Sequence, residues 1–127
     1  MDSSNKRVGT RFERYMCDEL SRQGWWVHFL SPNAAGAQPF DIIAIRGSHV
    51  LAVDCKTCKS KWFSYSRIET NQRLAFDTLM AKVDKRKVKC GFYILHNDSI
   101  IFLPYERVIE HEKHGGKAFD LEKETSR

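Results

Sequence analysis

The sequence has no long hydrophobic run and little that would divide it into separate parts. No apolar stretch approaches the roughly 20 residues of a membrane-spanning helix, and residues 1–7 lack the apolar core of a secretory signal. Internal repeats and low-complexity tracts are also missing. We therefore expect a soluble, cytoplasmic protein that makes no membrane contact and forms a single domain over residues 1–127.

Cysteine and histidine are too sparse, and wrongly spaced, for a thiolate–metal site. Cys55 and Cys58 have the C-x-x-C spacing of half a zinc site or a redox pair, but a second half-site at matching spacing is missing. None of the five histidines shows zinc-ligand spacing. The cysteines of a cytosolic chain are expected to be reduced.

The residues that are abundant indicate a folded, basic protein. Hydrophobic residues make up 42% of the 127 residues, enough to bury a core. The formal net charge is +5 and the pI about 9.1, which favours a polyanionic partner such as nucleic acid.

Hydrophobic periodicity and turn residues predict one α/β domain. The expected order is α-β-β-β-α-β-β, with helices over residues 5–23 and 69–83 and strands over residues 25–30, 40–45, 49–56, 90–95 and 100–103. These elements can bury their apolar faces if the five strands form a single β-sheet that is flanked by the helices. Residues 59–67 are expected to form a loop. A short helix is expected to follow residue 105, with a flexible tail from about residue 112, because Gly115-Gly116 and a charged end argue against packing.

The strand over residues 49–56 carries two charged side chains on one face. Side chains alternate along a strand, so Asp54 and Lys56 project together while Cys55 projects to the other side. Burying such charges is costly unless they are paired or bind something. An ion pair on an exposed edge strand is the structural alternative to a functional site.

A second carboxylate is expected nearby. A tight turn at residues 46–48 joins two strands, which lets Asp41 and Asp54 meet across a hairpin. Two converging carboxylates suit Mg²⁺ or Mn²⁺. Such an ion lowers the pKa of a bound water and polarises a phosphate, while Lys56 stabilises the developing charge. The backbone carbonyl of Cys55 is a candidate additional ligand. Glu13 is a candidate outer acid, or a simple partner of nearby arginines.

These motifs occur together in one order. Residues 9–14 (GTRFER), 24–27 (GWWV), 40–44 (FDIIA) and 54–56 (DCK), followed by Gln72, resemble the archaeal Holliday junction resolvases and their phage and bacterial relatives. Those proteins belong to the PD-(D/E)xK nuclease superfamily. The resemblance covers roughly residues 6–95. It implies a restriction-endonuclease-like fold with a mixed central β-sheet, and a Mg²⁺-dependent endodeoxyribonuclease that accepts Mn²⁺ as a substitute.

The resemblance also assigns roles to individual residues. Asp41 matches the metal-binding aspartate, and Asp54 matches the second acid. Lys56 matches the catalytic lysine, and Glu13 matches the acid on the first helix. Gln72 matches a polar helix residue, and Ser31 matches a serine near the scissile phosphate. The sequence departs from the resolvase pattern at two positions in or next to the acids. Phe40 stands where a proline usually precedes the aspartate, and Asp54 stands where resolvases more often have glutamate. For Gln72, an exposed helical position without a role is the alternative.

Basic and aromatic side chains outside this cluster are candidate DNA contacts. Arg7, Arg11 and Arg14 lie on the first predicted helix. Lys59, Lys61 and Trp62 interleave bases with an aromatic ring, which suits a strand-binding surface or a dimer contact. A loop that packs on itself is the alternative.

Three functions follow in order of preference. The first is a structure-selective endonuclease acting on a four-way DNA junction as a homodimer, whose two-fold symmetry matches that of the junction. The second is a restriction, repair or nicking nuclease on duplex or single-stranded DNA, since fold and metal site are shared. The third is a nucleic-acid-binding module without catalysis.

Overall fold

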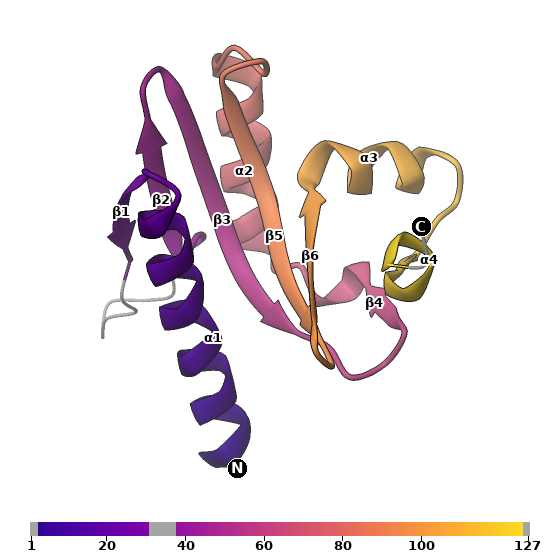
Figure 1. Cartoon of the computed structure of the whole chain (residues 1–127). Coiled ribbons are helices and arrows are strands. Elements are labelled where there is room, and N and C mark those ends of the chain that lie inside the picture. Colours follow the sequence, from indigo (N-terminus) through magenta and orange to yellow (C-terminus); the bar gives the residue numbers. More distant parts are fainter. Residues whose placement is uncertain (1–2, 31–37, 126–127) are drawn as a thin grey trace.

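A mixed β-sheet with helices on both faces organises the molecule (Figure 1). The computed structural model describes the backbone of residues 3–30 and 38–125, and the side chains of residues 11–30 and 38–123. The elements in chain order are α1 (Ser3–Arg22), β1 (Trp26–Phe29), β2 (Ile42–Arg46), β3 (His49–Thr57), β4 (Trp62–Ser64), the 3-10 turn η1 (Tyr65–Arg67), α2 (Thr70–Lys82), β5 (Val88–His96), β6 (Ser99–Pro104), α3 (Tyr105–Lys113), β7 (Ala118–Asp120) and α4 (Leu121–Thr125).

The strand order confirms the predicted fold class. Five strands follow the order β1-β2-β3-β5-β6. β3 and β5 run parallel, and every other neighbouring pair in this sheet is antiparallel. The β2–β3 turn contains Gly47 with φ of 61°, a conformation that glycine adopts without a steric penalty. None of the helices within the described ranges is long and apolar enough to cross a membrane.

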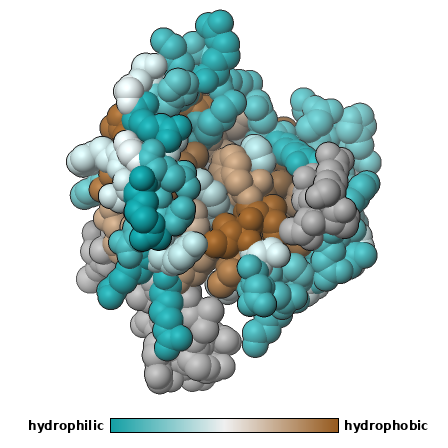
Figure 2. Space-filling model, in the orientation of Figure 1, coloured by the Kyte–Doolittle hydropathy of each residue, from teal (hydrophilic) through white to brown (hydrophobic). Residues whose placement is uncertain are grey.

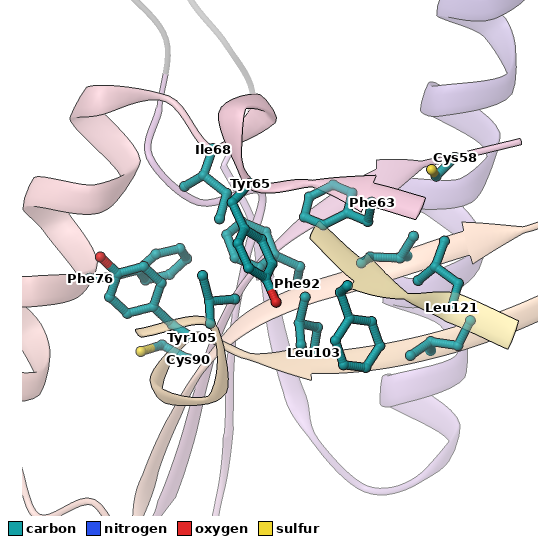
Figure 3. Packing of buried hydrophobic residues seen from close by; sticks show 14 of the residues in the cluster. Cys58, Phe63, Tyr65, Ile68, Phe76, Cys90, Phe92, Leu103, Tyr105 and Leu121 are labelled. Atoms are coloured by element: carbon teal, nitrogen blue, oxygen red, sulfur yellow. The ribbon is translucent and has the colours of Figure 1, made fainter. Parts of the chain in front are cut away.

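Each face of the sheet has its own core. On one face, α1 presents Phe12, Met16 and Leu20 at helical spacing to β2 and β3. On the other face, the fully buried Phe76 of α2 contacts the rings of Phe92 and Tyr105 (Figure 3). α1 and α2 therefore pack on opposite faces of the sheet, and β3 lies between these two helices.

The expectation of a flexible tail from about residue 112 is wrong for the residues described. α3 ends at Lys113, and β7 then pairs antiparallel with β4, placing Phe119 opposite Phe63. Leu121 is fully buried. Gly115 adopts φ of 87°, so it ends the helix and turns the chain back. The glycine pair therefore marks a turn that leads into further packed structure.

The same pairing corrects the predicted loop over residues 59–67. That segment contains β4 and η1, and Phe63 and Tyr65 within it are buried. His96 ties the end of the chain to this region: Nδ1 lies 2.9 Å from the Cys58 carbonyl oxygen and Nε2 lies 3.2 Å from Glu122 Oε2.

Within the described residues, part of the sheet face beside α1 is exposed. Tyr93 and Leu95 of β5 and Phe102 of β6 are only partly buried there, and Ile100 of β6 is 40% exposed. Figure 2 shows hydrophobic residues gathered between α1 and the part of the chain that holds α3 and α4.

Candidate active site

Asp41 and Asp54 lie opposite each other at the open end of the β2–β3 hairpin. Ile42 pairs with Val53 in antiparallel register, so the next position outward brings Asp41 to Asp54. The Asp41 backbone N–H donates to the Val53 carbonyl at 2.9 Å, which continues the ladder by one residue. Directly opposed residues point to the same face of a sheet. The expected meeting of the two carboxyl groups is therefore present.

The carboxyl group of Asp41 is held by the neighbouring strand. Its Oδ2 accepts a hydrogen bond from the backbone N–H of Cys55 at 2.7 Å. The charge of Asp54 also acts on the Asp41 carboxyl group, so the two side chains lie near each other.

Asp54 and Lys56 form a buried ion pair. Lys56 Nζ lies 3.1 Å from Asp54 Oδ2, and the two side chains are 15% and 8% exposed. The alternative of a surface ion pair is therefore wrong. A buried pair of charges must be compensated by further polar contacts.

Gln72 and Arg67 supply those contacts. Lys56 Nζ lies 3.4 Å from Gln72 Oε1 and 3.4 Å from the Arg67 carbonyl oxygen. Gln72 is 2% exposed, so the alternative of an exposed helical residue without a role is also wrong. Its Oε1 accepts the backbone N–H of Glu69 at 3.1 Å, as part of a capping box at the start of α2. The cap fixes the side chain that Lys56 contacts.

Burial and the neighbouring acids raise the pKa values of Asp41 and Glu13. Burial, and then the charge of Asp54, raise the pKa of Asp41 to about 8, against the opposing effect of the Cys55 N–H. The pKa of Glu13 on α1 is raised by burial and then by the charge of Asp54. Glu13 therefore lies within electrostatic reach of the two strand acids. The cluster combines three acids with one lysine, so it has an excess of negative charge when ionised.

Two thiols border the cluster on the α1 side of the sheet. Burial, then the charges of Asp41 and Asp54, raise the pKa of the Cys55 thiol. Burial also raises the pKa of the Cys17 thiol, with smaller contributions from acids that include Glu13. Both thiols are free and stay protonated in this environment. They pack as small apolar side chains between α1 and the sheet.

The donor chemistry of the cluster fits a hard divalent cation. In the described part of the chain, no group of three or more His, Cys, Asp or Glu side chains is arranged to hold a metal ion. Asp41 and Asp54 nevertheless form a pair of carboxylates with oxygen donors. Mg²⁺ commonly binds through one or two carboxylates and keeps several waters. A cation there would relieve the repulsion that raises the pKa of Asp41.

The candidate DNA contacts whose side chains the structure describes lie on the surface of the molecule. The side chains of Arg11, Arg14, Lys59 and Lys61 are exposed, and Trp62 is 52% exposed. The backbone of Arg7 lies in α1 but its side chain, like all of Ser31, falls outside the described residues. The Arg67 carbonyl was not foreseen from the sequence, since any residue type supplies a backbone oxygen.

A family model and a solved structure that match this chain describe the same kind of protein. The family model described as archaeal Holliday junction resolvase (Hjc) matches residues 4–122. Among solved structures, Hjc from Archaeoglobus fulgidus, a Holliday junction resolvase from an archaeal hyperthermophile, is similar with a TM-score of 0.58 and 25% identity. That match covers 77% of this chain and 78% of the other. No curated protein sequence matches.

Proposed function

The chain belongs to the archaeal Holliday junction resolvase family, which makes it a nuclease, and from this premise we propose that it is a metal-dependent endonuclease that resolves four-way DNA junctions. The observation that carries the proposal is the meeting of Asp41, Asp54 and Lys56 at one end of the β2–β3 hairpin. Buried acids that destabilise one another have no use in a module that only contacts phosphates. They are explained if the site binds a cation.

In this proposal Asp41 and Asp54 hold Mg²⁺, with Mn²⁺ as a substitute. Glu13 is an outer acid, and the Cys55 carbonyl is a further candidate ligand. A divalent ion bound there polarises a phosphate and lowers the pKa of a bound water. The residues that hold it are fixed before substrate arrives, because Asp54 lies on β3 and Asp41, directly before β2, is anchored by the Cys55 N–H.

Lys56 has a separate task in the proposed mechanism. Its ammonium group donates toward Asp54, Gln72 and the Arg67 carbonyl, so it is oriented from three sides. An oriented, nearly buried ammonium stabilises negative charge on a phosphate more strongly than a mobile one in water. Lys56 is therefore the proposed stabiliser of charge on the cleaved phosphate.

Substrate choice is tested by cleavage of matched DNAs in Mg²⁺. A four-way junction, a flap, a linear duplex and a single strand of related sequence are compared at equal concentration. Paired nicks confined to the junction support a resolvase. Equal cutting of the linear duplex would instead indicate a general nuclease, and no product from any substrate would contradict catalysis.

The raised pKa of Asp41 predicts a pH-dependent stability without metal. The pKa is 3.8 in its unperturbed form and about 8 in the folded protein, so between these values the folded state binds more protons than the unfolded state. The free energy of unfolding of the metal-free protein is therefore expected to fall as the pH rises, by on the order of 2 kcal/mol. Asp41→Asn should reduce this slope, as measured by denaturant unfolding from pH 4.5 to 8.5 in EDTA. An unchanged slope would contradict the assignment.

A homodimer is the proposed working form, because a four-way junction has two-fold symmetry and the chain is short. The exposed apolar face of β5 and β6 supports such a contact, with Ile100 its most exposed member. Ile100→Glu is expected to weaken self-association at least tenfold, because burying an unpaired carboxylate is costly. Sedimentation measures this, with Ile45→Glu as the matched control on β2, where the side chain is also 40% exposed. Equal dimerisation by the Ile100 variant would exclude this face.

A further inference from the structure

Trp62 is a large aromatic side chain held in place yet left open to solvent. Its residue pairs with Asp120 across β4 and β7, and its backbone N–H donates to Ser60 Oγ at 3.0 Å. The residue is still 52% exposed. The ammonium group of Lys61 lies 5.1 Å from the ring centroid and pairs with Asp120 at 3.6 Å. The backbone is therefore fixed and Lys61 lies over one face of the indole, while about half of the residue's surface remains accessible.

A groove of about 470 Å³ opens beside this ring. It is lined by Trp62, Ala118 and Phe119 from the β4–β7 pair and by Arg107 and His111 from α3, elements that lie together at one side of the molecule (Figure 1). The Arg107 guanidinium lies 5.1 Å from the Phe119 ring centroid. The volume falls within the range of small-ligand sites, which are mostly apolar with a few polar groups.

The His111 wall of the groove is fixed. His111 Nδ1 lies 2.7 Å from the Tyr65 hydroxyl, and the two rings meet edge to face at 5.6 Å. A Cβ atom at Gly116 would lie 2.2 Å from the His111 ring, so only glycine leaves space for the ring there. A fixed wall needs no reorganisation when a ligand enters.

The charges around the groove nearly balance, which argues against a phosphate inside it. The basic residues Arg107 and Lys123 are matched by the acids Glu110 and Asp120. Glu110 pairs with His114 at 3.0 Å, and Asp120 Oδ1 accepts two backbone N–H groups at 3.1 Å. A neutral planar ring suits this lining, and aromatic side chains bind nucleobases through such faces. Lys61, whose ammonium lies over one face of the Trp62 ring, adds a positive charge there for the attached phosphate.

The chain links the groove to the candidate active site. β4 leads directly into η1, whose last residue, Arg67, places its carbonyl oxygen 3.4 Å from Lys56 Nζ. Five residues of chain span at most about 17 Å. Trp62 therefore lies within a distance of Lys56 that a few nucleotides of a DNA strand can span.

We propose that this groove binds an unpaired base of the DNA substrate, stacked on Trp62. The proposal rests on the proposed nuclease function, because that function brings DNA to the neighbouring site. It adds a substrate class: branched DNA with an unpaired nucleotide near the branch point binds more tightly than the same junction fully paired.

Binding to two junctions in EDTA tests the proposal without cleavage. One junction is fully paired, and the other carries an unpaired 2-aminopurine beside the branch point. The wild-type protein is expected to bind the second about tenfold more tightly, the scale of one base–aromatic stack, and to quench its fluorescence. Trp62→Ala should lose both effects and Trp62→Phe should retain most of them. Trp26→Ala, a change at a tryptophan 59% exposed on β1, is the matched control.

The outcomes separate this proposal from the nuclease proposal. Equal binding of both junctions by the wild type, absent quenching, or an unchanged preference in Trp62→Ala would overturn the base-binding groove. A parallel Mg²⁺ assay on the fully paired junction reports catalysis independently. Cleavage without a preference for the unpaired base would contradict only the base-binding proposal. A preference for the unpaired base without cleavage would contradict only the nuclease proposal.

Discussion

Replacing Asp54 by asparagine is expected to reduce the rate of junction cleavage by about 1,000-fold or more, equal to about 4 kcal/mol of transition-state stabilisation. The change removes one of the two carboxylates proposed to hold Mg²⁺ and also the charge that Lys56 pairs with at 3.1 Å. Asparagine has nearly the same shape as aspartate, so the substitution should leave the register of the β-sheet intact. Single-turnover cleavage with enzyme in excess over junction measures the effect.

The matched control is Asp98→Asn. It makes the same chemical change in the exposed β5–β6 turn, so it should cleave at the wild-type rate. Junction binding by Asp54→Asn in EDTA is expected to persist, because phosphate contacts by basic side chains supply most of the affinity for DNA. Cleavage by Asp54→Asn at the rate of the control would remove Asp54 from the mechanism.

Replacing Lys56 by alanine is the second large effect, with an expected loss of about 100- to 1,000-fold in the cleavage rate. The ammonium is the only cation placed against the acid pair, so no neighbour substitutes for it among the described contacts. Junction affinity should change little, because one phosphate contact among many is lost. Lys82→Ala, at the exposed end of α2, is the lysine control.

Gln72→Ala separates positioning from direct action. Gln72 contacts Lys56 and caps α2, but it is not proposed to touch the substrate. Its loss should lower the rate about tenfold and cost about 1 kcal/mol of stability through the broken cap. A loss in rate equal to that of Lys56→Ala would indicate that Gln72 acts on the substrate itself.

The sequence predicted the parts of the site that depend on short-range geometry. Alternation along one strand placed Asp54 beside Lys56, and a tight turn fixed the register that brings Asp41 opposite Asp54. Both are consequences of neighbouring residues and a period of two. For the same reason the central sheet and its two main helices were predicted in the right order.

The parts that sequence reasoning missed depend on distant partners. β4 forms only because Phe63 meets Phe119 from a strand more than fifty residues later, and neither segment is a convincing strand alone. The Gly115 turn was interpreted as the start of a frayed end, since glycine signals turn and tail alike. Burial, which raises the pKa of Asp41, is likewise a property of the assembled fold.

Mn²⁺ binding to the protein without DNA is the most direct measurement of the central claim, that the carboxylate of Asp54 on β3 and that of Asp41, directly before β2, form a cation site. Titration followed by electron paramagnetic resonance counts bound ions and gives their affinity. The account predicts a site in the wild type that Asp41→Asn and Asp54→Asn each weaken at least tenfold, while Asp98→Asn binds as the wild type does. Undiminished binding in both strand variants would contradict it.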